Sequence, residues 1–132
     1  MRARFSVSVA AAATVMSFSA GLSAHHGSAA YDTSELKTIV GEVTQFHFIN
    51  PHVLIYVAVT EDDGSIVEWS GELTNPTRLS RGQDAQVPWN KDILQPGDEI
   101  TLVGNPARNG APSLRLRRVV DAKGTVLLDN EN

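Results

Sequence analysis

Short runs in which apolar and polar residues alternate fill most of the chain after residue 35. The clearest run has aliphatic residues at alternate positions: Val53, Ile55, Val57 and Val59. A period of two residues is typical of a β-strand with one buried face. Comparable runs, separated by turn residues, occupy residues 36–48, 53–60, 66–73, 99–103, 113–120 and 125–128. This repeated pattern predicts an all-β domain with little helix.

One segment, residues 74–82, departs from the strand pattern. Asn75 can cap a short helix, Pro76 suits its first turn, and Gly82 can end it. Three strands, a short helix and two or three further strands follow the order of an oligonucleotide/oligosaccharide-binding (OB) barrel. We therefore predict an OB-like Greek-key barrel of five or six strands with one short helix; a small β-sandwich is the alternative. Gly104-Asn105-Pro106 is expected to form a turn.

The first 24 residues have the pattern of an export signal. Arg2 and Arg4 form a positive start, an apolar stretch covers residues 7–18, and small residues lead to Ala24. The stretch is rich in Ser and Ala and falls short of the roughly 20 strongly apolar residues that span a bilayer. We expect cleavage after Ala24, a periplasmic location, and no stable membrane insertion after processing.

Cleavage leaves two regions of different character. Residues 25–35 are small, polar and aperiodic, which predicts a flexible N-terminal arm. Residues 36–132 have the size of a single β-barrel domain. Because two basic residues leave with the signal, the formal net charge changes from −4 to −6. Such a charge repels nucleic acid and anionic lipid, so we expect no nucleic-acid partner.

Four histidines and the absence of cysteine limit the metal chemistry of the chain. Without thiolates, any metal must be bound by nitrogen and oxygen. A new amino terminus at His25 would offer its α-amine and ring Nδ1 as one chelate. A second imidazole would complete a T-shaped set of three nitrogens, as in a histidine brace, which suits Cu(II). The candidate ligands, in decreasing order, are His25, His52, His26 and His47, with Glu72 as a further candidate.

The position of the cut decides which copper site can form. A cut after Ser23 would leave Ala24-His25-His26 at the terminus. A histidine at position three lets the amine, two backbone amides and the imidazole enclose Cu(II) or Ni(II) in a square plane. A cut after Ala24 instead gives an open site, and the small Ala24 at the boundary favours it.

Several motifs of the chain resemble those of a family of small exported bacterial proteins of unknown function. The motifs are His25-His26-Gly27-Ser28, Asn50-Pro51-His52, Glu68-Trp69-Ser70, Asn75-Pro76 and Pro96-Gly97-Asp98. The resemblance covers nearly the whole chain after the signal. It implies a periplasmic location and a compact β domain, and it brings no established activity or catalytic residue.

Three functions from different classes fit these features. The first is capture or delivery of Cu(II) through the processed terminus. The second is a metal-free adaptor whose barrel binds a periplasmic protein or a small ligand, with Trp69 or Trp89 beside an apolar groove. The third is a copper-dependent redox enzyme with an open metal position. No nucleophile elbow, phosphate-binding loop or dinucleotide motif is present in the sequence, so we expect binding rather than catalysis.

One compact basic cluster contains Arg115, Arg117 and Arg118. Alternation places Arg115 and Arg117 on one strand face, opposite Leu114 and Leu116. Oligonucleotide binding would add stacking aromatic residues to such charges, and none is interleaved here. The cluster is therefore expected to be a solvated strand face.

Overall fold

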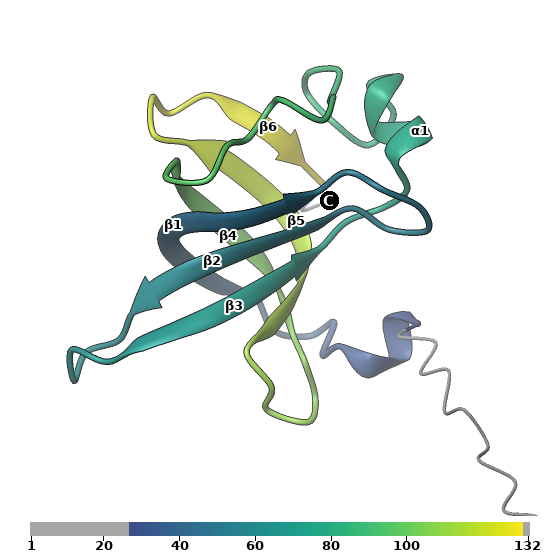
Figure 1. Cartoon of the computed structure of the whole chain (residues 1–132). Helices are drawn as coiled ribbons and strands as arrows, with labels where there is room; N and C mark the ends of the chain where they lie inside the picture. Colours follow the sequence, from purple (N-terminus) through teal and green to yellow (C-terminus); the bar gives the residue numbers. More distant parts are fainter. Residues whose placement is uncertain (1–26, 131–132) are drawn as a thin grey trace, which may run out of the picture.

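The computed structural model describes residues 27–130 (Figure 1), and this part of the chain is mostly β-sheet. A single 3-10 turn, η1 (Ser28–Ala30), precedes the strands. One short helix, α1 (Pro76–Ser80), lies between the third and fourth strands. The six strands are β1 (Lys37–His47), β2 (Leu54–Thr60), β3 (Ile66–Glu72), β4 (Glu99–Pro106), β5 (Ser113–Asp121) and β6 (Val126–Asp129). The prediction of an all-β fold with a short helix is confirmed.

The first five strands close into a barrel, and β6 extends it along β5. The strand order is β3-β2-β1-β4-β5-β6, and a parallel pairing between β3 and β5 joins the two ends of the barrel. In that pairing Ser70 lies opposite Ser113, and Glu72 lies opposite Arg115. Closure with the helix between β3 and β4 is the arrangement of an OB-like barrel rather than of a sandwich.

Strand β1 belongs to both sides of the barrel. Residues 37–42 pair with β4, whereas residues 42–47 pair with β2, and the register shifts between Val43 and Gln45. Gly41 lies next to this change of partner, and a Cβ there would be 2.6 Å from the main-chain oxygen of Ala58. Only glycine allows so close an approach of two strands, so Gly41 permits β1 to pack against β2 beside this register shift.

The core fills the barrel with aliphatic residues from β1, β2, β4 and β5 and one large aromatic residue. Trp89 is 1% exposed, and its indole N–H donates to the main-chain oxygen of Leu127 at 3.1 Å. This bond satisfies the only polar atom of a buried tryptophan side chain. Trp89 therefore holds the loop after α1 against β6 and presents no face to a ligand.

The helix forms as its sequence predicts, whereas β4 is longer than expected. Asn75 caps α1 by accepting from the main-chain N–H of Arg78 at 3.0 Å, and Pro76 is in the first turn. The predicted turn at residues 104–106 is wrong, because these residues continue β4 and pair with β5. A register shift after Val103 lets the strand continue through a glycine and a proline.

The segment before β1 is attached to the barrel, which the sequence did not predict. Tyr31 is 4% exposed and forms a bridge with Ala107. The main-chain N–H of Asp32 donates to Pro106, and that of Arg108 donates to Ala30. A single aromatic side chain therefore anchors residues 27–35 of the predicted arm, whose other residues are small and polar. Within residues 27–130 no helix is long and apolar enough to cross a membrane.

Candidate metal-binding pocket

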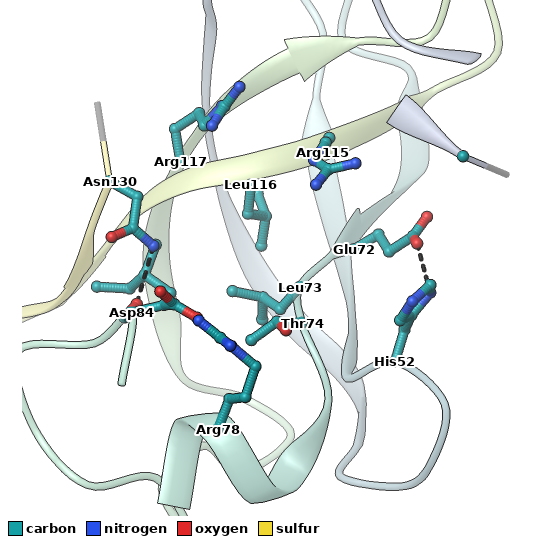
Figure 2. Close-up of a pocket in the computed structure, with 12 residues that line it drawn as sticks. His52, Glu72, Leu73, Thr74, Arg78, Asp84, Arg115, Leu116, Arg117 and Asn130 are labelled. Atoms are coloured by element: carbon teal, nitrogen blue, oxygen red, sulfur yellow. Dashed lines mark hydrogen bonds and ion pairs between the residues drawn. The ribbon is translucent and has the colours of Figure 1, made fainter. Parts of the chain in front are cut away.

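A pocket of about 670 Å³ opens between Gly27, the β1–β2 loop, α1 and β5 (Figure 2). Gly27, His52, Glu72 and Arg115 contribute to its wall. Three leucines, Leu73, Leu116 and Leu128, also line it. The pocket thus combines one imidazole, charged groups and a patch of hydrocarbon.

The imidazole of His52 is oriented by a carboxylate at the end of β3. Its Nδ1 lies 2.6 Å from Oε1 of Glu72, as the dashed line in Figure 2 shows. A carboxylate accepts hydrogen bonds, so Nδ1 carries the proton and donates it. In a neutral imidazole this hydrogen bond leaves Nε2 as the nitrogen with a free lone pair. The His52 side chain is 49% exposed, whereas that of Glu72 is 15% exposed.

The second oxygen of Glu72 is bound by the segment before β1. The hydroxyl of Tyr31 donates to Oε2 of Glu72 at 2.8 Å and lies 3.3 Å from Oγ of Ser113. Oγ of Ser70 in turn donates to Oγ of Ser113 at 3.1 Å. Both oxygens of Glu72 therefore accept hydrogen bonds, which fits a residue that orients His52 better than one that binds a metal directly. Neither Tyr31 nor this network was identified from the sequence.

The structure does not bring His47 to the pocket. His47 Nε2 lies 3.0 Å from Oε1 of Gln45, and its ring packs edge-on against Tyr56 with centroids 5.2 Å apart. These contacts occupy the His47 ring within the sheet of β1 and β2. His25 and His26, together with the predicted signal, lie outside the described residues.

Within residues 27–130 the structure contains no group of three His, Cys, Asp or Glu side chains that could hold a metal ion. His52 and Glu72 are the only pair of this kind that the pocket brings into contact in that range. A metal site at His52 would therefore need donor atoms from outside residues 27–130.

The arginine cluster is less exposed than expected. Arg115 and Arg117 are half-buried, and Leu114 and Leu116 at the alternate positions of β5 are buried, as alternation predicts. Both arginines and Leu116 contribute to the pocket wall. Nε of Arg117 donates to Oδ1 of the buried Asn105 at 2.8 Å. The prediction of a simple solvated face therefore does not describe these side chains.

The remaining tryptophan is also partly covered. Nζ of Lys37 lies 5.3 Å from the ring centre of Trp69, and the indole N–H donates to Glu61 at 3.2 Å. Trp69 therefore packs beneath a cation on the barrel surface and is not among the residues that line the pocket.

Comparison with protein families gives a match over most of the chain. The model of a family of unknown function, DUF6152, matches residues 10–114. The chain belongs to the DUF6152 family. The matched range includes the paired histidines, His52 and Glu72. Comparison with curated proteins gives no match for this DUF6152 protein.

A solved structure similar to the DUF6152 protein is a mitochondrial single-stranded DNA binding protein, Rim1, from S. cerevisiae. The two chains are 13% identical, with a TM-score of 0.46 over 72% of this chain and 95% of Rim1. The OB-like architecture of the DUF6152 protein is established by its own strand order and by the β3–β5 closure.

Replacing Tyr31 of the DUF6152 protein by phenylalanine should weaken the fold in a pH-dependent way. Tyr31→Phe removes the bonds to Glu72 and Ser113, and we expect the free energy of unfolding at pH 7 to fall by about 1–3 kcal/mol. Burial raises the pKa of Tyr31 above its ordinary value of 10.0, and the bond to Glu72 acts in the same direction. Urea unfolding of both proteins between pH 7 and 11 measures the difference.

The sign of this pH dependence follows from the raised pKa. The folded state keeps the Tyr31 proton at pH values where the unfolded state has lost it. Tyr31 therefore stabilises the fold fully below pH 10.0, and this contribution is lost as the pH rises through the raised pKa. The difference in free energy of unfolding between wild type and Tyr31→Phe should therefore decrease above pH 10.0. A difference that stays constant to pH 11 would contradict this role of Tyr31.

Proposed function

We propose that the protein is exported, is cleaved after Ala24, and captures or delivers Cu(II) through His25 and His52. The observation that carries the proposal is the hydrogen bond between His52 Nδ1 and Glu72. Histidines that bind metals almost always donate their other ring N–H to a carboxylate, a carbonyl or water, which fixes the tautomer and the ring orientation. His52 has this arrangement, with Nε2 left as the donor atom.

The position of Gly27 supports a role for the residues before it. Gly27 and His52 line the same pocket. His25 precedes Gly27 by two residues, so its Cα lies at most about 7 Å from that of Gly27. The segment after Gly27 is in turn attached through Tyr31, whose hydroxyl binds Glu72. This attachment of the segment after Gly27 supports the proposal that the beginning of the processed chain can reach the imidazole of His52.

The available donor atoms favour copper. The amine and ring of His25 with Nε2 of His52 would provide three nitrogens, and no cysteine is present to favour Zn²⁺ or Cu(I). Cu(II) prefers tetragonal nitrogen sites and has the highest affinity among the divalent first-row metals. A fourth position would stay open to water or to a donor from another protein, which suits transfer of the ion.

Blocking the amino terminus tests this proposal. The natively exported protein is first shown by intact mass to begin at His25, and it is then titrated with Cu(II) against a chelator of known affinity. A matched protein carries three extra residues before His25. Three are needed because one or two would place His26 or His25 at position three and create the square-planar site. The extension removes one chelate ring, and we expect the affinity to fall about tenfold or more.

The intact mass and the Cu(II) affinity together distinguish the possible outcomes. Equal affinity of the native and extended proteins would exclude the terminal chelate. An intact mass that corresponds to a chain beginning at Ala24 would indicate the closed square-planar site instead of the open site. A protein that binds no copper and copurifies with a periplasmic protein would favour the adaptor function instead.

A further inference from the structure

We infer that the pocket also binds a small organic carboxylate, which pairs with Arg115. This inference goes beyond copper binding and does not depend on it. It rests on an arginine that lines the pocket and has no carboxylate partner among residues 27–130, and on the charges and hydrocarbon around it.

The guanidinium of Arg115 forms no hydrogen bond and no ion pair with any of residues 27–130, although a carboxylate lies on the neighbouring strand. Glu72 is its register partner across the parallel β3–β5 pairing. Both oxygens of Glu72 instead accept from His52 and Tyr31. Figure 2 shows Arg115 on the same side of β5 as this pair. A half-buried guanidinium without a partner loses hydration that no protein group replaces, so an external oxyanion would satisfy it.

The other charges of the pocket leave a local excess of positive charge. Arg78 pairs with Asp84 at 2.5 Å, so these two charges compensate each other. Glu72 offsets one of the two remaining guanidiniums, those of Arg115 and Arg117. The described wall is therefore cationic even when His52 is neutral. The formal charge of the whole chain is −4, so this excess is a property of the pocket.

The lining indicates an organic anion rather than a bare inorganic one. Leu73, Leu116 and Leu128 contribute small apolar areas to the pocket wall, since each is at most 6% exposed. A ligand with a short hydrocarbon body can cover them while its carboxylate meets the guanidinium fork, which matches a carboxylate in two parallel hydrogen bonds. A small dicarboxylate would offer one carboxylate to Arg115 and a second to the remaining positive charge of the same pocket wall.

Glutarate is a suitable probe. The metal-free full chain is titrated with glutarate, with neutral glutaramide and with inorganic phosphate, and binding is followed by calorimetry and by the NMR signal of the Arg115 side chain. We expect glutarate to bind, glutaramide not to bind, and phosphate to bind more weakly. Arg115→Gln should weaken glutarate binding about tenfold or more, because a charge-assisted pair is lost.

Matched variants keep the result interpretable. Arg81→Gln removes an exposed arginine that does not line the pocket, and it should leave the affinity unchanged. Arg115→Lys keeps the charge without the planar fork and should bind with intermediate affinity. Unfolding curves of all variants show whether the barrel is intact. Equal binding of glutarate and glutaramide, or an unchanged affinity in folded Arg115→Gln, would overturn the inference.

Glu131 is an anion of the chain itself that has to be compared with the added ligand. Glu131 follows Asn130, which lines the pocket. Glu131→Gln should bind glutarate as the wild type does. If glutarate bound only to Glu131→Gln, the occupant would be the chain's own carboxylate, and the proposal of an external ligand would be wrong.

Discussion

Cu(II) affinity should fall about 10- to 100-fold or more when His52 is replaced by alanine in the protein that begins at His25. His52→Ala removes the barrel's imidazole from the proposed set of three nitrogens and leaves the chelate at the terminus intact. The side chain is 49% exposed, so its removal should cost little stability. Chelator competition measures the affinity, and electron paramagnetic resonance counts the coupled nitrogens, which should decrease by one.

A second histidine provides the control. His47→Ala removes an imidazole of the same chemistry that contacts Gln45 and Tyr56 away from the pocket. It should leave both the affinity and the number of coupled nitrogens unchanged. If His47→Ala weakened copper binding as much as His52→Ala, the metal would be held elsewhere, and the orientation of His52 by Glu72 would have another purpose.

Gly104→Val should destabilise the barrel by about 3 kcal/mol or more, or prevent folding. Gly104 pairs with Lys37 on β1 and with Leu116 on β5, and any Cβ at this position would clash with the main-chain oxygen and carbon of Arg115. Backbone atoms cannot turn aside as a flexible side chain can, so β4 and β5 would have to separate. Urea unfolding followed by circular dichroism measures the loss.

The same strand provides a control for the β-branched side chain. Thr101→Val introduces valine at a half-buried position of β4 that already carries a β-branched residue. Its free energy of unfolding should stay within about 1 kcal/mol of the wild type. Gly104→Ala should give a smaller loss than Gly104→Val. Wild-type stability of Gly104→Val would show that β4 and β5 can move apart at this point without cost.

The strands and the helix could be predicted because their signals are local. Alternation marks β2, and Asn75-Pro76 marks the beginning of α1, where the structure shows the expected cap. The end of β4 could not be predicted in this way. Glycine and proline normally indicate a turn, whereas here a register shift between β4 and β5 and the close approach at Gly104 keep them in the sheet.

The candidate site was only partly accessible from the sequence. The motif Asn50-Pro51-His52 indicated His52 as a candidate. Counting residue pairs outward from the turn between β2 and β3 places Glu72 opposite Leu54, which is two residues from His52. No such count leads to Tyr31, whose contacts with Glu72 and Ser113 span 41 and 82 residues. Long-range contacts of this kind depend on barrel closure, which no local pattern specifies.

The pairing of β3 with β5 would make the proposed copper binding depend on the closed barrel. Those two strands meet only in the finished barrel, and their pairing lies immediately beside the carboxylate that orients His52. If β3 and β5 separated, Glu72 would no longer be positioned to orient the imidazole of His52. A copper ion bound to His52 would therefore stabilise the closed barrel by mass action. The copper-bound protein should therefore resist proteolysis near the β3–β5 pairing better than the metal-free protein. Opening of the barrel would release the copper ion.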